Sequence, residues 1–262
     1  MKMKLLALLL GLWVGGAARL PAQTGIHIDP QPRFREDFVS PEVGSHQGYA
    51  TDGNYHYIFD TMGIYKRLDD KSWTLEASNA VPFRDYPIVS HFGDGDYYQG
   101  KLYLVAEVWA GCTNVRNQSI LVYDAGSLEL LGVTNISAQS HEVSGLVIVP
   151  EDGKNGVIYV TSYCDGSQIF KYDLATFAYL GSLKLSGSIP LAQGIAYGRG
   201  VFYVPSDIGH IYSFTRSGKV SRVYTDHRHG SHEGLAWVKG SLRWLIDEGP
   251  GKRFIHYLTP IR

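Results

Sequence analysis

Short apolar runs recur along this chain, and each follows a glycine placed where a tight turn is expected. Gly100 precedes the run 102–105, and Gly156 precedes the run 157–160. Runs of this kind, rich in valine, isoleucine and tyrosine and bounded by glycine, are typical of β-strands joined in hairpins. The same pattern follows three more glycines, Gly53, Gly200 and Gly240. The chain is therefore expected to be all-β.

A short sequence motif centred on one glycine precedes each of these hairpins. Its fullest copy is Ser231 to Trp237, and the earlier copies contain Gly48, Gly93, Gly145 and Gly194. A third apolar run follows every hairpin, and a fourth follows in four units. Four-stranded units repeated five times predict a five-bladed β-propeller, whereas a β-sandwich would leave the matching positions unexplained.

The end of the chain lacks a fourth strand for its last unit. The residues after Gly234 suffice for three strands, and the segment Arg33 to Val39, ahead of the first copy, is a spare strand. We expect this segment to close the ring as the outer strand of the last blade.

The first residues have the features of a secretory signal peptide. Lys2 and Lys4 precede the apolar run Leu5 to Val14, and a cleavage site is expected after Ala22. The run is too short to span a bilayer. Residues 1–22 are therefore predicted to be a cleaved signal peptide, and residues 23–262 a single secreted or periplasmic propeller domain.

Charge and composition restrict the partners. The net charge is −1, with acidic and basic residues interspersed. No basic patch for nucleic acid is evident, and no later stretch is apolar enough to span a membrane. We expect a monomer that acts on a small molecule or a polysaccharide.

Propeller geometry places two sets of residues on one rim of the ring. The start of each first strand and the end of each second strand lie at the same face. The residues at the starts are His46, His91, His141, Gln193 and His232. Those at the ends are Asp60, Glu107, Tyr163, Asp207 and Asp247. Four histidines and one glutamine are thus predicted to ring the axis, with four carboxylates and a tyrosine behind them.

Three interpretations of this ring stay open. Histidine–carboxylate pairs could simply hold neighbouring blades in register. Alternatively, the imidazoles and Gln193 could bind a divalent transition metal, such as zinc, manganese, iron or copper, with the carboxylates orienting the ligands. The same pairing would also make the histidines, or Tyr163, catalytic acids or bases.

Other residues are expected near that rim. Trp109 and Tyr163 follow second strands and could stack on a flat substrate. Arg228 and His229 lie on the loop that enters the last blade, where they could contact substrate. Asp94-Gly95-Asp96 is interpreted as a turn.

Cys112 and Cys164 are the only two cysteines, and they fall in equivalent loops of adjacent blades. In an exported protein such a pair is more often a disulfide than a metal site. We therefore predict that they are bonded to each other.

Two phrases resemble those of known propeller families. Ala192 to Tyr197 (AQGIAY) and Leu121 to Leu128 (LVYDAGSL) are similar to repeat phrases of the five-bladed glutamine cyclotransferases. His232 to Trp237 (HEGLAW) resembles a strand start of lactonase-type propellers. The resemblance implies a propeller fold. The tryptophan-glycine and asparagine-glutamate-leucine-glutamate stretches of the cyclotransferases are not evident, and the histidines depart from the calcium site of the lactonases.

The leading functional hypothesis is a lyase or hydrolase that acts on an extracellular carbohydrate or a small ester. The alternatives are a non-catalytic propeller that binds a glycan or a protein, and a glutaminyl-cyclase-like enzyme. The chain has no G-x-S-x-G elbow, phosphate loop, H-E-x-x-H helix or dinucleotide fingerprint. Serine-nucleophile and nucleotide chemistry are therefore not supported.

Overall fold

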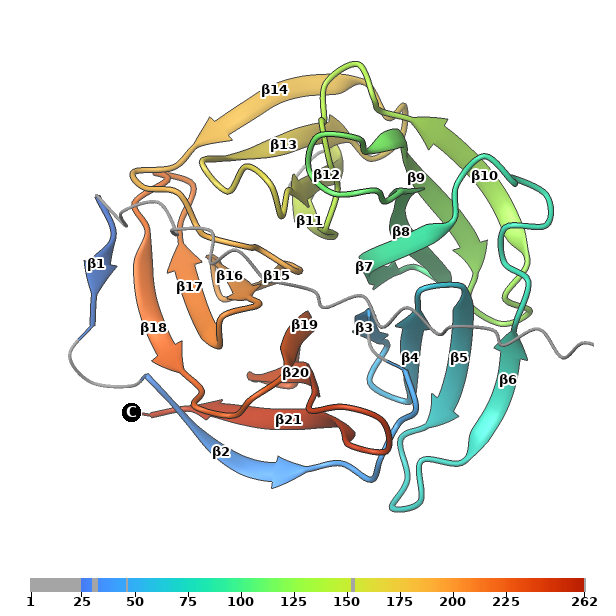
Figure 1. Ribbon diagram of the computed structural model, residues 1–262, viewed down its shortest axis with the longest axis horizontal. Helices are drawn as coiled ribbons and strands as arrows, with labels where there is room; N and C mark the ends of the chain where they lie inside the picture. Colours follow the sequence, from blue (N-terminus) through green and yellow to red (C-terminus); the bar gives the residue numbers. More distant parts are fainter. Residues whose placement is uncertain (1–24, 30–32, 46, 152–153, 262) are drawn as a thin grey trace, which may run out of the picture.

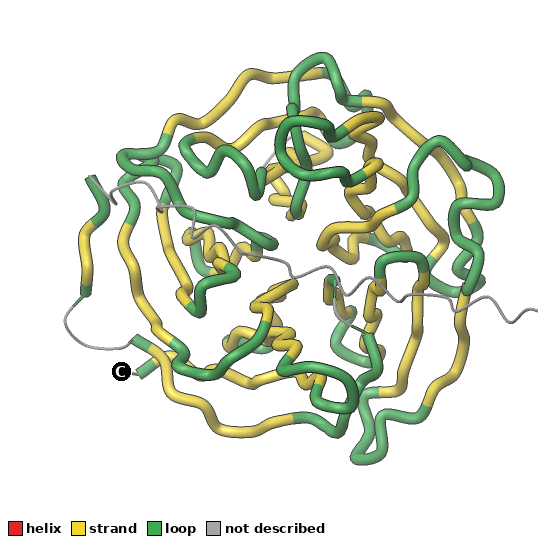
Figure 2. The backbone as a smooth tube through the Cα atoms, in the orientation of Figure 1, coloured by secondary structure: helices red, strands yellow, loops and turns green. Residues whose placement is uncertain are grey.

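The computed structural model describes residues 25–29, 33–45, 47–151 and 154–261. These residues form five sheets around a central axis, each with four antiparallel strands (Figure 1). Strands and loops make up the whole of the described chain (Figure 2). The predicted five-bladed β-propeller is confirmed. The described residues contain no apolar helix of membrane-spanning length.

The strands of each blade follow one another outward from the axis in chain order (Figure 1). Blade 1 contains β3 (Gly48–Thr51), β4 (Tyr55–Asp60), β5 (Gly63–Leu68) and β6 (Leu75–Asn79). Blade 2 contains β7 (His91–Tyr98), β8 (Lys101–Val108), β9 (Arg116–Asp124) and β10 (Leu130–Asn135). Blade 3 contains β11 (Gly145–Glu151), β12 (Lys154–Thr161), β13 (Gln168–Asp173) and β14 (Tyr179–Lys184). Blade 4 contains β15 (Ala196–Gly198), β16 (Val201–Ser206), β17 (His210–Phe214) and β18 (Ser221–Thr225).

Blade 5 is completed by the beginning of the chain, as predicted. It contains β19 (Ser231–Val238), β20 (Ser241–Asp247), β21 (Arg253–Pro260) and β2 (Phe34–Val39). The closing strand β2 runs antiparallel to β21, from Phe34 opposite Pro260 to Val39 opposite His256. A short strand, β1 (His27–Ile28), pairs in parallel with the outer edge of blade 4.

The turn glycines act through their backbone conformation. Three hairpins between first and second strands turn on two residues that both have positive φ, which defines a type I′ turn. These pairs are Gln99-Gly100, Arg199-Gly200 and Lys239-Gly240. The twist of a type I′ turn matches that of the strands it joins, so the glycines identified in the sequence fix the hairpins locally.

The apolar core lies between adjacent blades. Between blades 4 and 5, for example, Ile211 packs in one cluster with Leu235, Trp244 and Phe34. All four side chains are buried. Burying one such side chain contributes roughly 1.5–3 kcal/mol to stability, so each blade depends on its neighbour for part of its stability.

The axis itself is occupied by a carboxyl group. Asp94 lies within β7, and not in the turn expected from the sequence, and it is completely buried. Its Oδ1 accepts the amide N–H of Tyr49 at 2.8 Å, and its Oδ2 accepts that of Leu235 at 3.1 Å. One side chain of blade 2 thereby binds the inner strands of blades 1 and 5.

Steric contact with Asp94 explains why glycine recurs in the repeated motif. A Cβ atom on Gly194 would lie 2.3 Å from Oδ2 of Asp94, and one on Gly234 would lie 2.4 Å from Oδ1. A Cβ on Gly48 would also approach Asp94 closely, at 2.8 Å from its Cα. Only glycine lets these inner strands close around the carboxyl group.

Candidate active site

A pocket of about 180 Å³ opens at the rim where first strands begin and second strands end. Its polar lining includes Glu107, Glu142 and His91, and the amides of Gln47 and Gln193. This volume equals that of roughly six water molecules in the liquid. The pocket can therefore hold a group about the size of one amino-acid side chain.

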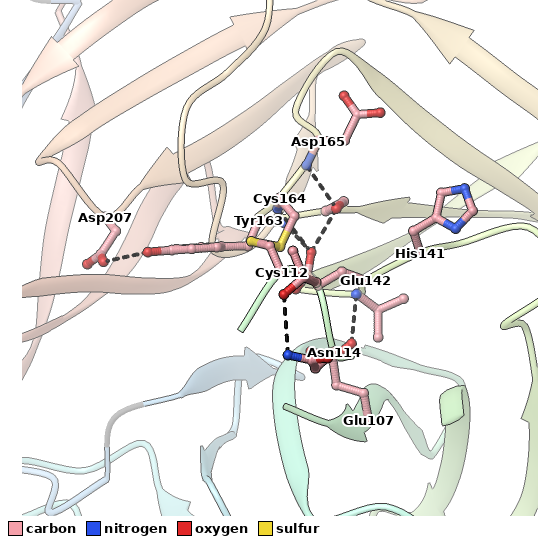
Figure 3. Close-up of a disulfide and its surroundings, with 12 residues drawn as sticks. Glu107, Cys112, Asn114, His141, Glu142, Tyr163, Cys164, Asp165 and Asp207 are labelled. Atoms are coloured by element: carbon pink, nitrogen blue, oxygen red, sulfur yellow. Dashed lines mark hydrogen bonds between the residues drawn. A yellow bond between two sulfur atoms is a disulfide. The ribbon is translucent and has the colours of Figure 1, made fainter. Parts of the chain in front are cut away.

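Two glutamates of adjacent blades face each other here (Figure 3). Glu107, in β8, accepts the amide N–H of Val143 on Oε2 at 3.0 Å. Glu142, in the loop before β11, is buried and accepts three donors on one oxygen. These donors are Ser162 Oγ at 2.8 Å, the Cys164 N–H at 3.3 Å and the Tyr163 N–H.

Burial and mutual repulsion change the protonation of this pair. Burial, together with the charge of Glu142, raises the pKa of Glu107 to about 9. Burial also raises the pKa of Glu142, to about 7, but the hydrogen bonds from Ser162, Cys164 and Tyr163 oppose the rise. Two neighbouring carboxyl groups with unequal donors divide into an acid and a base. Glu107 is the protonated member near neutral pH.

Aromatic rings form one wall of the pocket. The rings of Trp109 and Tyr163 meet edge to face at 5.7 Å, and the imidazole of His91 stacks beside Trp109 at 6.4 Å. The Tyr163 hydroxyl points toward Oδ2 of Asp207 at 3.5 Å (Figure 3). These rings present flat faces to a bound molecule.

The predicted disulfide is present beside this wall. Cys112 and Cys164 are bonded, with their Cα atoms 5.6 Å apart, and join the loops after β8 and β12 (Figure 3). Disulfides of this kind are typical of an oxidising compartment.

We expect removal of this bond to lower the stability of the protein. The bridge closes a loop across 52 residues of sequence, and the chain-entropy model assigns about 4 kcal/mol to a loop of that length. The Cys112→Ser/Cys164→Ser protein should lose about 2–4 kcal/mol in urea denaturation relative to the oxidised wild type. Two free thiols in denatured, unreduced wild-type protein would contradict the bond itself.

The structure brings together some of the residues predicted from the sequence. His91, Gln193, Glu107, Trp109 and Tyr163 all line the pocket. Their assignment to catalysis, metal binding or substrate contact stays a prediction.

Two of the predicted histidines have other surroundings. His232 is buried in blade 5, where its Nε2 lies 3.0 Å from Oδ2 of Asp226 and its ring packs on Trp244. The side chain of His141 is exposed, and it points away from the disulfide in Figure 3. His46 lies outside the described residues.

The remaining polar residues of the rim have partners of their own. Asp60 and Asp247 accept backbone N–H groups within their own turns, and Asp247 also pairs with Arg253. Arg228 pairs with Glu36 and Asp226.

Two residues predicted from the sequence are left, Asp207 and His229. Oδ1 of Asp207 accepts the amide N–H of His232, and the side chain of His229 is exposed. Within the described part of the chain, no group of three or more histidine, cysteine, aspartate or glutamate side chains is arranged to hold a metal ion. The metal site remains a prediction.

Sequence reasoning missed Glu142, Gln47 and Glu233. The signal was present for two of them, because a glutamate follows the histidine in both His141-Glu142 and His232-Glu233. The pairing also differs from the expected register: His91 lies opposite Glu107, whereas Ser231, and not His232, lies opposite Asp247, and a shift of one residue turns a side chain to the other face of the sheet.

Glu233 is a further buried acid close to the axis. It is 3% exposed, and its Oε2 atom has no hydrogen-bond partner. Burial, together with the charges of Asp207, Asp247 and Asp94, raises the pKa of Glu233 well above its ordinary value. Burial likewise raises the pKa of Asp94, although the amide N–H groups of Tyr49 and Leu235 oppose the rise.

These acids predict how stability depends on pH. Glu107, whose folded pKa is about 9, holds between about pH 5 and pH 9 a proton that the unfolded state has released, and the pKa values of Glu233 and Asp94 are raised in the same direction. Stability should therefore fall as pH rises. Burial lowers the pKa of His56, His210 and His256, which removes stability below about pH 6.5. Thermal melting should show the highest midpoint in mildly acidic buffer.

Two substitutions test the origin of that dependence. Glu233→Gln keeps the shape but cannot ionise, so it should flatten the fall of the melting midpoint between about pH 6.5 and pH 9. Glu129→Gln, at an exposed position on the β9–β10 turn, should leave the curve unchanged. If the melting midpoint of the wild-type protein instead rose between about pH 6.5 and pH 9, the prediction that burial raises the pKa of Glu233 and Asp94 would be wrong.

Comparison with known proteins gives no family by sequence. No protein-family model matches the chain, and no curated protein matches its sequence. Among solved structures, it is similar to the glutaminyl cyclase of Myxococcus xanthus, with a TM-score of 0.62 and 11% identity over 87% of this chain and 97% of that one. A computationally designed protein, Ika8, matches with a TM-score of 0.40 and 11% identity over 82% of this chain and 59% of the other. The similarity to the cyclase shows that the two chains share the five-bladed propeller fold.

Proposed function

We propose that this chain is an exported enzyme whose rim pocket performs acid–base chemistry on a substrate with a primary amine. The reaction we favour is cyclisation of an N-terminal glutaminyl residue with release of ammonia. The observation that carries the proposal is the pair of unequal glutamates, Glu107 and Glu142, in a pocket the size of one side chain. The shared fold with a glutaminyl cyclase supports the same choice.

The charge of the pocket favours an amine. Its described lining contains two glutamates, a histidine and two glutamine amides, and neither lysine nor arginine. A carboxylate attracts an α-ammonium group, and the indole face of Trp109 attracts cations as well. The amides of Gln47 and Gln193 can hydrogen-bond the side-chain carbonyl of the substrate.

The two glutamates match the proton transfers that cyclisation requires. The α-amine must lose a proton as it attacks the side-chain carbonyl carbon, and the departing amide nitrogen must gain one to leave as ammonia. Glu142, with three donors on its carboxylate, is suited to accept the first proton. Glu107, protonated near neutral pH, is suited to supply the second.

The test is turnover of a synthetic peptide that begins with glutamine. Ammonia should appear together with a product that is lighter by one ammonia molecule. Glu107→Gln and Glu142→Gln should each lower kcat by roughly 10²–10⁴-fold, because each removes one proton transfer. The same change at the exposed Glu129 is the control and should leave kcat unchanged. No turnover of any glutaminyl peptide by the wild-type protein would refute this function.

A second candidate is the metal-dependent or histidine-based lyase or hydrolase expected from the sequence. One observation favours it, since His91 lies in the same pocket as both glutamates and beside the flat face of Trp109. Elemental analysis of the purified protein and a panel of polysaccharides and small esters test this candidate. A stoichiometric transition metal that His91→Ala removes would favour it over the cyclase. Ligand binding without any turnover would instead indicate a non-catalytic propeller.

A further inference from the structure

We propose that the Cys112–Cys164 disulfide positions the hydrogen-bond donors of Glu142, so that its reduction by a thiol leaves a folded but less active protein. The activity readout rests on the proposed function. The titration of Glu142, however, tests the positioning without any substrate.

The bridge joins the two loops that form the pocket wall. Trp109 lies three residues before Cys112, and Tyr163 comes directly before Cys164. In the structure the two rings touch edge to face, beside the bridge. Crosslinking the loops therefore holds the two aromatic side chains against each other.

The same loop of blade 3 supplies all three donors to Glu142. Ser162 Oγ and the N–H groups of Tyr163 and Cys164 converge on one carboxylate oxygen. One of those donors is thus the backbone of a bridged cysteine. Movement of Cys164 would weaken the hydrogen bonds that oppose the effect of burial on Glu142.

Reduction is accessible to a small reagent, because both cysteines are exposed. A thiolate attacks one sulfur, forms a mixed disulfide with it and releases the other cysteine as a thiolate, which takes up a proton. A second thiol then breaks the mixed disulfide. The protein gains two electrons and two protons, and two thiol molecules become one disulfide.

Loss of the disulfide should change the pH range in which Glu142 is ionised and can act as a base. With fewer donors on its carboxylate, its pKa should rise by roughly half a unit to one unit. The acidic limb of the pH–rate profile should then move up by the same amount, and turnover near pH 6.5 should fall about 3- to 10-fold. Turnover at higher pH should recover, since Glu142 is ionised again there.

The experiment compares oxidised protein with protein reduced by dithiothreitol, well below the melting temperature. The pKa of Glu142 is measured by ¹³C NMR of labelled glutamate side chains, with the signal assigned from Glu142→Gln. The pH–rate profile is measured on the glutaminyl peptide. Cys112→Ser/Cys164→Ser should match the reduced protein, and dithiothreitol should not change it further.

Two variants separate positioning from general loss of stability. Ser162→Ala removes one hydrogen-bond donor while the disulfide stays intact, so it should also raise the pKa of Glu142. Ile169→Val, in the buried core of blade 3, should lower stability without moving the titration.

An unchanged Glu142 titration after reduction would overturn the proposal and leave the bridge a purely stabilising one. A shifted titration without turnover of any glutaminyl peptide would uphold the positioning and refute the proposed function.

Discussion

Deletion of residues 23–40 should abolish cooperative folding of the propeller. This deletion removes β2, the outer strand of blade 5, which pairs with β21 from His256 to Pro260. It also removes Phe34, which is 4% exposed and packs with Trp244 and Leu258. Loss of a buried phenylalanine side chain alone costs about 3–5 kcal/mol, a large part of the stability of a typical domain.

The deletion also breaks a polar network. Glu36 pairs with Arg228 at 2.9 Å, and its Oε2 accepts a hydrogen bond from Nδ1 of His256 at 2.7 Å. Without Glu36, the buried imidazole of His256 loses the hydrogen bond that its Nδ1 makes. The edge of β21 would then be exposed to pairing with other chains, and aggregation should accompany unfolding.

Circular dichroism during heating measures the effect. The matched control is deletion of residues 23–28, which removes β1, a two-residue strand with exposed side chains, and the partly buried Ile26. The control should melt cooperatively within a few degrees of the full chain. A protein without residues 23–40 that melts like the full chain would show that β2 does not close the ring.

Gly194→Ala should destabilise the protein by roughly 1–3 kcal/mol. The added Cβ would lie 2.3 Å from Oδ2 of Asp94, which is completely buried. Either the inner strand of blade 4 moves outward, or Asp94 turns away and leaves the N–H of Leu235 without an acceptor. Overpacking and an unsatisfied buried group each cost about 1–3 kcal/mol.

Gly132→Ala is the matched control for this substitution. Gly132 lies in β10, and no atom lies within 4 Å of a Cβ built there. Its urea denaturation midpoint should remain close to that of the wild type, or increase slightly. Combining Gly194→Ala with Asp94→Ala should cost less than the sum of the two single changes, because the clash disappears. If Gly194→Ala and the wild type were equally stable, the tight packing of Asp94 against Gly194 would be wrong.

Much of the fold could be predicted because its determinants are local. Turn glycines such as Gly100 and Gly240 select hairpins by their backbone conformation, and the apolar runs beside them form strands. Repetition of one unit then specifies the number of blades, and a spare strand such as 34–39 specifies the closure. The pairing of Cys112 with Cys164 follows in the same way, because equivalent loops of adjacent blades lie side by side.

The candidate site was only partly predictable. The sequence located the rim and identified His91, Glu107, Trp109, Tyr163 and Gln193 as residues near it, and the pocket contains all five. It did not reveal that His232 turns into its blade toward Asp226, or that Glu142 faces the pocket. His232 lies one residue out of register with His91, because Ser231 and not His232 is opposite Asp247, and Glu142 takes its direction from the donors of the neighbouring loop.

The sequence by itself determined the all-β class, the five repeated units, the closing strand and the disulfide, since each depends on local conformation or on repetition along the chain. The tertiary structure alone decided which side chains meet at the axis. Asp94 was interpreted as part of a turn, yet it binds two other blades, and Glu107 meets Glu142 across a blade boundary. Such contacts join residues far apart in the chain, and the burial that raises the pKa values of these acids exists only once all five blades have closed around them.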